Sequence, residues 1–310
     1  MARVLVTRPL AGPALDRLRA GHEVTVRDEL LPPRPAELAT LAGACEGLLS
    51  LLTDPVDAAL FEACPNLRAV ANYAVGVDNI DLAAATGRGI PVGNTPDVLT
   101  EATADLALAL MLSLMRRIPD GERYVRNGEW STWEPTALLG RDLHHSTVLV
   151  VGAGRIGTAV ARRLEGFGAG VVFAGRGDRL APLLPRADIV TLHCPLTDET
   201  RGLIDAAALA EMRPHAYLVN TARGPVVDPA ALEWALREGL IAGAALDVTE
   251  PEPLPYDHPM LAVPNLLVVP HLGSATHATR AAMTELAVDN LLAALAGRPM
   301  PNCANPEVYK

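Results

Sequence analysis

A glycine-rich segment at residues 152–157 has the residue types and spacing of a dinucleotide-binding loop. It reads Gly152-Ala153-Gly154-Arg155-Ile156-Gly157 and lies between a predicted strand and an amphipathic predicted helix. In such a loop the first glycine allows a tight turn, the second lets the backbone approach a pyrophosphate, and the third lets the helix pack on the strand. The amides at the start of the helix face the anion. We therefore predict a dinucleotide site, with a plain glycine-rich turn as the alternative.

The end of the next predicted strand indicates which dinucleotide is bound. Gly175 stands where NAD-binding proteins usually carry an acid that grips the ribose, and Arg176 and Arg179 follow it. The missing carboxylate and the two arginines favour a 2′-phosphate, so NADP(H) is predicted as the preferred cofactor and NAD(H) as the alternative. The arginines can also be ordinary solvated charges. Asp178, turned inward, would instead bind the ribose hydroxyls of NAD.

Three polar residues further along the chain are Arg223, Glu252 and His271, and each follows a predicted strand. Open parallel sheets bind ligands beyond the carboxyl ends of their strands, so the three side chains are predicted to meet at one site. Taken singly, each also fits a plain structural role: a loop arginine, a solvated acid or a histidine that closes a strand.

The alternation of short β-branched runs with helical patterns predicts an α/β fold of two Rossmann-like domains with parallel sheets and an interdomain cleft. An Ala/Leu-rich helix from Thr100 to about Arg117, ended near Pro119, joins two βα series, and a helix over 278–295 returns to the first body. The predicted flavodoxin-like substrate-binding domain is discontinuous, at residues 1–98 and 279–310, and residues 99–278 form the dinucleotide-binding domain. The strands of the second series are predicted at Thr147–Val151, Val171–Ala174, Ile189–Leu192, Ala216–Asn220, Ala242–Val248 and Leu266–Val269.

Composition excludes several classes of protein. A formal net charge of -10 argues against binding to nucleic acid or to an anionic membrane surface. Lys310 is the only lysine, which removes Schiff-base catalysis and the phosphate-binding P-loop. The motifs of zinc proteases and of serine hydrolases are absent as well. A small-molecule ligand fits this composition better.

The four cysteines, Cys45, Cys64, Cys194 and Cys303, form no Cys-x-x-Cys pair, which favours reduced thiols over a disulfide frame or a zinc site, and no metal is predicted. The longest apolar stretch, Leu106 to Met115, is too short to cross a bilayer, and no secretory signal is evident at the N-terminus. We therefore expect a cytoplasmic protein without a membrane partner.

These motifs together resemble those of the D-2-hydroxyacid dehydrogenases. The glycine loop, Gly76-Val77-Asp78 and the segments around Arg223, Glu252 and His271 follow in that family's order over nearly the whole chain. Within the family, the segments 127–130, 247–255 and 271–277 are most similar to glyoxylate/hydroxypyruvate reductases. The resemblance implies hydride transfer from a nicotinamide to a small 2-oxo acid such as glyoxylate or hydroxypyruvate, giving the D-2-hydroxy acid.

The resemblance also implies a role for each of the three polar residues. Arg223 would hold the substrate carboxylate and polarise the 2-oxo group, a task that suits a planar, permanently charged guanidinium. His271 would give a proton to the carbonyl oxygen as the hydride arrives. Glu252 would orient the imidazole and favour its charged form.

Further contacts come from the same resemblance. The amides of Val75 and Gly76 would cradle the substrate carboxylate, and Ser274 would lie beside His271 in the substrate pocket. Trp133, with Trp130, would belong to a loop that reaches the pocket of a neighbouring subunit, which implies a homodimer, although ordinary packing of these rings is the alternative. The implied cofactor contacts are Gly152, Gly154, Arg155, Ile156, Gly157, Gly175, Arg176, Arg179, Cys194, Pro195, Thr221, Ala222, Asp247 and Gly273.

Two other functions stay open at this point. One is another D-2-hydroxyacid dehydrogenase, such as a phosphoglycerate-type enzyme, although those often carry an appended regulatory domain. The other is a non-catalytic NAD(H)-sensing protein, because some relatives act as transcriptional corepressors and can keep their catalytic residues. L-lactate and malate dehydrogenases fit less well because their glycine loop lies near the N-terminus, whereas this one starts at Gly152.

Overall fold

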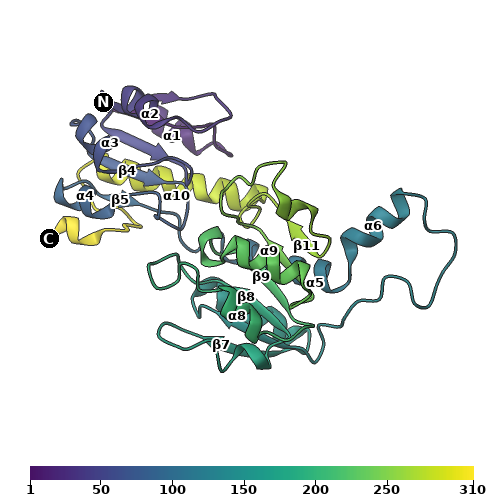
Figure 1. The fold of residues 1–310 in the computed structure, drawn as a ribbon. Coiled ribbons are helices and arrows are strands. Elements are labelled where there is room, and N and C mark those ends of the chain that lie inside the picture. The colour runs from purple at the N-terminus through teal and green to yellow at the C-terminus, as the bar shows by residue number, and fades with distance from the viewer. The chain divides into compact units, whose positions relative to one another are not determined.

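The computed structural model describes residues 1–310. The chain forms two compact units, a first unit of residues 1–99 with 275–310 and a second unit of residues 100–274 (Figure 1). Each unit contains one parallel sheet. No helix is both long enough and apolar enough to cross a membrane.

The sheet of the first unit has the strand order β2-β1-β3-β4-β5, which is the flavodoxin-like order. Helix α10 packs against α1 and against β3, β4 and β5, so the end of the chain completes the unit that the beginning starts. The strands are β1 (Arg3–Val6), β2 (Glu23–Val26), β3 (Gly47–Ser50), β4 (Ala69–Asn72) and β5 (Val92–Gly93). The helices are α1 (Ala14–Arg19), α2 (Pro35–Ala42), α3 (Ala58–Ala63), α4 (Leu82–Gly87) and α10 (His277–Leu295).

The sheet of the second unit has the order β11-β10-β9-β8-β6-β7. The chain goes from β6 to β7 on one side and then to β8 on the other, which makes the edge of β6 a topological switch point, where such sheets bind ligands. The strands are β6 (Thr147–Val151), β7 (Gly170–Ala174), β8 (Ile189–Leu192), β9 (Tyr217–Asn220), β10 (Gly243–Leu246) and β11 (Leu266–Val268). The helices are α5 (Thr100–Met115), α6 (Ile118–Arg126), α7 (Arg155–Gly166), α8 (Ala206–Glu211) and α9 (Pro229–Arg237).

The strands of the second unit are apolar because both faces of the sheet are covered. Leu149 and Val151 belong to a buried cluster on one face, and Val148 and Val150 to a cluster on the other. Successive side chains of a strand point to opposite faces, so a continuous apolar run is what a doubly covered parallel strand requires. This is why the sequence pattern predicts these strands well.

The segment after α5 differs from the prediction. The sequence predicts a helix that ends near Pro119, but α5 ends at Met115, and Arg117 adopts a left-handed φ of +53°. Helix α6 then starts at Ile118 with Pro119 in its first turn, where the missing N–H of proline has no helical partner to lose. In Figure 1 α6 and the chain that follows it project from the rest of the second unit.

Candidate active site

The glycine loop has the geometry of a dinucleotide-binding turn. Gly152 has a φ of +104°, and a Cβ there would lie 2.7 Å from the backbone N of Cys194. A Cβ on Gly157 would lie 2.0 Å from the carbonyl oxygen of Gly152. Gly154, the N-cap of α7, has open space where its Cβ would be. The first and third glycines are therefore required by the fold, and the second leaves room for an anion at the helix N-terminus, as a dinucleotide pyrophosphate needs.

Four further residues that the sequence predicts as cofactor contacts lie in this loop or next to it. Arg155 is exposed in the first turn of α7, and Ile156 packs against the core of the unit. Just beyond the end of β8, the strand next to β6, Cys194 is buried and Pro195 is exposed. All of them therefore lie at the carboxyl ends of β6 and β8.

The end of β7, from which the sequence predicts the cofactor preference, carries both signs of charge. The carboxylate of Asp178 accepts a hydrogen bond from the N–H of Gly175, 2.7 Å from Oδ2. Arg176 and Arg179 are exposed on the same turn. An acid therefore lies beside the end of β7 although Gly175 occupies the sequence position at which the acid is usually found.

His271 and Glu252 form a hydrogen-bonded pair. Oε1 of Glu252 lies 2.6 Å from Nδ1 of His271, and Oε2 accepts from the N–H of Thr249 at 3.4 Å. The two side chains are 27% and 32% exposed, so a substrate can reach the imidazole. A carboxylate on Nδ1 fixes the ring orientation and leaves Nε2 for proton transfer.

The turn that carries His271 is held by Asp247. The Asp247 carboxylate is 2% exposed and accepts hydrogen bonds from the N–H groups of Leu272, at 2.5 Å, and Gly273, at 2.9 Å. Burial raises the pKa of Asp247, and these two backbone donors act against that rise. His271 itself has a left-handed φ of +53°, an uncommon backbone conformation for a residue with a Cβ. Such conformations occur at functional sites where surrounding bonds maintain them.

Arg223 lies beyond the end of β9, two strands from β11. The side-chain amide of Asn220 donates to the backbone carbonyl of Arg223 at 2.9 Å, and Nη1 of Arg223 donates to the carbonyl of Ala222 at 2.8 Å. The backbone carbonyl and the guanidinium of Arg223 are therefore both hydrogen-bonded within the loop 220–223. The strand order β11-β10-β9 brings the loops of all three predicted catalytic residues to the same edge of the sheet.

In the first unit, the loop after β4 presents backbone amides. The carbonyl of Val75 accepts from Nδ2 of Asn94 at 2.8 Å, and the carbonyl of Gly76 accepts from Nδ2 of Asn72 at 2.9 Å. The N–H groups of Val75 and Gly76 have no acceptor within the chain. Such a loop is suited to bind an anion such as a carboxylate. Its approach to Arg223 and His271, which belong to the second unit, stays a prediction.

Sequence reasoning missed the polar side chains that hold this loop. Asn72 is fully buried on β4, where Ser50 and Asn79 also hydrogen-bond to its side chain. Asn79 in turn donates to the backbone carbonyls of Leu51 and Asp54. The available signal is an uncharged polar residue at the end of an otherwise apolar strand, because such a group is buried only with its hydrogen bonds made.

The remaining predicted contacts have a place in the second unit or on its projecting segment. Ser274 is 9% exposed and follows directly on the His271 turn. Trp130 and Trp133, after α6, are 62% and 78% exposed. No group of three or more histidine, cysteine or acidic side chains is arranged to hold a metal ion.

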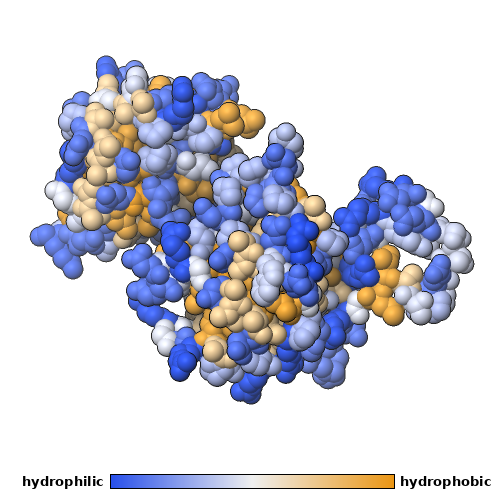
Figure 2. Space-filling model, viewed as in Figure 1, coloured by the Kyte–Doolittle hydropathy of each residue, from blue (hydrophilic) through white to orange (hydrophobic).

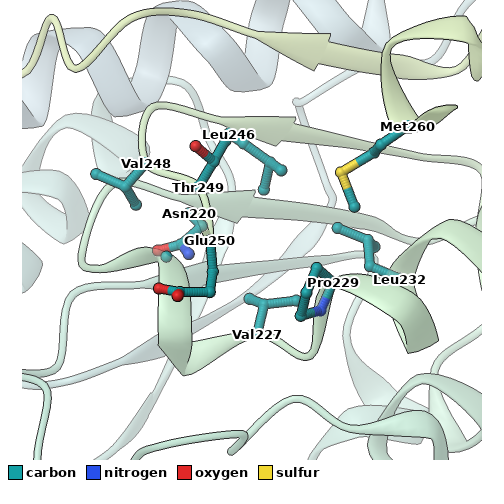
Figure 3. Close-up of a pocket in the computed structure, with 10 residues that line it drawn as sticks. Asn220, Val227, Pro229, Leu232, Leu246, Val248, Thr249, Glu250 and Met260 are labelled. Atoms are coloured by element: carbon teal, nitrogen blue, oxygen red, sulfur yellow. The ribbon is translucent and has the colours of Figure 1, made fainter. Parts of the chain in front are cut away.

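A small pocket lies under the Arg223 and Glu252 loops (Figure 3). Its walls are mainly apolar, and it leaves about 10 Å³ for solvent, room for one water molecule at most. It is therefore packing space below the loops and not the substrate site. The residues around it are Asn220, Gly224, Val227, Pro229, Leu232, Leu246, Val248, Thr249, Glu250 and Met260.

Known proteins resemble this chain along nearly its whole length. The model of the D-isomer specific 2-hydroxyacid dehydrogenase family, NAD binding domain, matches residues 108–273. The glyoxylate reductase of Korarchaeum cryptofilum is 46% identical over 99% of this chain and 97% of its own. A solved structure of a Thermus thermophilus protein is 50% identical, with a TM-score of 0.93, over 97% of this chain and 99% of its own. The NADPH-dependent glyoxylate/hydroxypyruvate reductase of Sinorhizobium meliloti, solved with citrate, is 35% identical, with a TM-score of 0.86, over 99% of both chains.

Reduction of a carbonyl by a nicotinamide needs a dinucleotide-binding loop and a group that can give a proton. The second unit carries a glycine loop of suitable geometry and the His271–Glu252 pair, as expected of a nicotinamide-dependent dehydrogenase. The matches identify it more closely: the chain belongs to the D-isomer-specific 2-hydroxyacid dehydrogenase family and is an NAD(P)-dependent oxidoreductase. The family predicted from the sequence motifs is confirmed, as are the two parallel α/β sheets.

Proposed function

We propose that the protein reduces glyoxylate or hydroxypyruvate to the corresponding D-2-hydroxy acid, with NADPH as the preferred reductant. The observation that carries the proposal is the pair of Glu252 and His271, 2.6 Å apart at the sheet edge that also carries Arg223 and the glycine loop. The names of the relatives from Korarchaeum cryptofilum and Sinorhizobium meliloti support the same substrate class.

Some of these residues bind the substrate and others transfer the proton. Arg223 and the amides of Val75 and Gly76 bind the carboxylate of the 2-oxo acid, and the guanidinium also polarises the 2-oxo group. The bound NADPH supplies the hydride. His271 donates a proton from Nε2 to the carbonyl oxygen, and Glu252 on Nδ1 stabilises the charged imidazole from which that proton comes.

A panel of 2-oxo acids assayed with both reduced cofactors tests this function. Glyoxylate and hydroxypyruvate are expected to give the highest kcat/KM, ahead of pyruvate and longer 2-oxo acids, when the loss of nicotinamide absorbance is followed. Phosphohydroxypyruvate as the best substrate would favour a phosphoglycerate-type enzyme. Tight NADH binding without turnover of any 2-oxo acid would favour a sensing protein.

Cofactor preference is expected to depend on Arg176. A charge-assisted hydrogen bond contributes about 1.5–3 kcal/mol, so Arg176→Ala should lower kcat/KM for NADPH by roughly ten- to a hundredfold and leave kcat/KM for NADH nearly unchanged. Arg237→Ala, which removes an exposed arginine on α9, is the matched control. If the ratio of kcat/KM for NADPH to kcat/KM for NADH is unchanged in Arg176→Ala at low salt, the arginines of this turn are ordinary solvated charges.

Asp178 is the opposing charge on that turn. Its carboxylate, on the N–H of Gly175, lies where it repels a 2′-phosphate and can accept from ribose hydroxyls. Asp178→Asn removes the charge and keeps an acceptor oxygen for Gly175. We expect this variant to raise kcat/KM for NADPH relative to kcat/KM for NADH. The same ratio as in the parent protein would show that Asp178 has no part in cofactor selection.

We also expect a homodimer, because the segment that begins at Arg117 exposes five large apolar side chains. Figure 2 shows apolar surface on this projecting segment, and exposed apolar patches of this kind mark interaction surfaces. A cavity of about 390 Å³, lined in part by Arg117, Asp120, Tyr217 and Leu266, lies beside it. The exposed apolar side chains are Ile118, Val125, Trp130, Trp133 and Leu139.

Sedimentation at micromolar concentration is expected to give twice the mass of one chain. Val125→Asp, which puts a charge into the apolar area of α6, should shift the protein toward the monomer. Leu30→Asp, at an 88% exposed position of the first unit, should leave the dimer intact. A monomeric parent protein would contradict the expectation.

The cellular location is proposed to be the cytoplasm. All four cysteines are free thiols, and Cys45, Cys64 and Cys194 are buried. Unpaired cysteines suit a reducing compartment.

A further inference from the structure

His193 connects the glycine loop with the Arg223 loop. It is the first residue after β8, the strand between β6 and β9. Its backbone lies against the glycine loop, because a Cβ on Gly152 would be 2.8 Å from the His193 carbonyl oxygen. Its ring contacts two hydroxyls: Nε2 lies 2.9 Å from Oγ1 of Thr191 and Nδ1 lies 3.2 Å from Oγ1 of Thr221. One side chain thus links the ends of two neighbouring strands.

Thr221 leads directly to the substrate arginine. Thr221 and Ala222 are 8% and 7% exposed, so neither has much freedom to move. The carbonyl of Ala222 accepts the 2.8 Å hydrogen bond from Nη1 of Arg223. The Thr221–Ala222 backbone therefore provides one of the hydrogen bonds that hold the guanidinium. Thr191 is thus connected to the guanidinium of Arg223 by the hydrogen bonds of His193 with Thr191 and Thr221, the peptide bond from Thr221 to Ala222, and the hydrogen bond between Ala222 and Arg223.

The imidazole of His193 is suited to a structural link and not to proton transfer. Burial lowers its pKa to about 4, so the ring is neutral near pH 7. A neutral imidazole has one N–H donor and one acceptor nitrogen, and a threonine hydroxyl can take either complementary role. Both ring nitrogens of His193 are engaged, whereas His271 keeps Nε2 for substrate.

We propose that His193 is a positioning residue for Arg223: it holds Thr221, and thereby fixes the Ala222 carbonyl that orients the guanidinium relative to the glycine loop. The proposal rests on the proposed function only in assigning Arg223 to the substrate carboxylate. Misplacement of a binding group by a fraction of an ångström weakens its interaction with substrate, and the dinucleotide contacts on β6 are left in place.

Two variants remove the link from its two ends. His193→Phe keeps a planar ring without hydrogen-bonding nitrogens, and Thr221→Val removes the hydroxyl. Each is expected to raise KM for glyoxylate by about tenfold. Kd for NADPH, titrated without 2-oxo acid, should stay within about twofold of the parent, because the cofactor contact implied for Thr221 and Ala222 is made by their backbone, which both variants keep. Because both variants break the same interaction, the double variant should be no worse than either single one.

Matched controls separate the link from general damage. His193→Gln retains a donor and an acceptor and should recover most of the parental KM. His215→Phe removes another hydrogen-bonded histidine, which lies 2.9 Å from Asp188 near the opposite end of the same strands, and should leave KM unchanged. If His193→Phe does not fold, KM for glyoxylate is compared between Thr221→Val, which lacks the hydrogen bond, and His193→Gln, which retains a donor and an acceptor.

Two readouts are independent of turnover. Oxalate, an unreactive dicarboxylate, should bind the NADPH complex of His193→Phe about tenfold more weakly than the parent complex by calorimetry. Crystal structures of the two proteins should show the Arg223–Ala222 hydrogen bond kept in the parent and lost in the variant. If the parent turns over no 2-oxo acid, the proposed function fails, and these structures still decide the role of His193.

Three results would overturn the proposal. The first is a parental KM and oxalate Kd in His193→Phe. The second is a double variant in which the two losses multiply, because His193 and Thr221 would then act separately. The third is a Kd for NADPH that rises as much as KM for glyoxylate, which would make His193 part of the cofactor site.

Discussion

Replacement of His271 by alanine is expected to lower kcat for 2-oxo acid reduction by about a hundredfold or more. The substitution removes the imidazole that Glu252 holds at 2.6 Å, and with it the proton that the carbonyl oxygen needs as the hydride arrives. Kd for NADPH should change by less than about twofold, because the backbone of the turn is held by Asp247 through Leu272 and Gly273 and not by the imidazole ring. Steady-state kinetics and a separate NADPH titration measure the two effects.

The backbone of His271 needs its own control. Its φ of +53° is strained for alanine but is tolerated by asparagine, which also keeps a polar side chain. We expect His271→Asn to fold at least as well as His271→Ala and to be equally slow. Recovered turnover in the asparagine variant would assign the loss to backbone strain, and unchanged turnover in both would remove His271 from the mechanism.

The fold was predictable wherever a strand is covered on both faces. Thr147–Val151 and Ile189–Leu192 are predicted with the bounds that the structure has, since their apolar runs leave no other arrangement in a parallel sheet. In the first series the last element that the sequence predicts is the strand Arg68–Ala71, so α4 and β5 are not predicted. Both are short, and β5 has only the two residues Val92 and Gly93, too few for a period to appear. The sequence does not predict helix α6, because Pro119 indicates the end of a helix, although proline also fits the first turn of a new one.

The predicted site residues were those whose chemistry is visible in their type and position. Arg223 and His271 each follow a strand, and the glycine spacing marks the loop at 152–157. The supporting residues were not visible in this way. Asp247 was predicted only as a cofactor contact, which stays a prediction, and the structure shows that both of its carboxylate oxygens hold the turn of His271. Its partners are backbone amides, and no sequence pattern records which amides a side chain will meet.

The same limit applies to Asp178. Its sequence position, after Gly175, does not match the usual ribose-binding acid, but a tight turn brings its carboxylate back to the Gly175 N–H. A backbone that reverses direction over a few residues changes which side chain occupies a given point in space. The proposed cofactor preference therefore rests on the geometry of this turn as well as on the residues in it.

Arg223→Lys is expected to damage the enzyme severely even though it conserves the charge. The guanidinium has several N–H groups in a fixed plane, so it can donate to the Ala222 carbonyl through Nη1 and still meet a carboxylate with others. A lysine ammonium has three N–H donors, but they all belong to one nitrogen and lack the planar arrangement of the guanidinium. We therefore expect it to lose one of the two partners. Loss of one charge-assisted hydrogen bond, about 1.5–3 kcal/mol, corresponds to roughly a ten- to hundredfold fall in kcat/KM for glyoxylate.

A chemical rescue experiment distinguishes the contribution of the planar guanidinium donors from that of the positive charge. Added guanidinium should restore part of the activity of Arg223→Ala, whereas an alkylammonium ion at the same concentration and ionic strength should restore little. Arg237→Lys, at an exposed position on α9, is the control and should behave as the parent. If Arg223→Lys keeps the parental KM and kcat, or if both cations rescue the alanine variant equally, Arg223 contributes only positive charge, and the planar recognition of the substrate carboxylate must be abandoned.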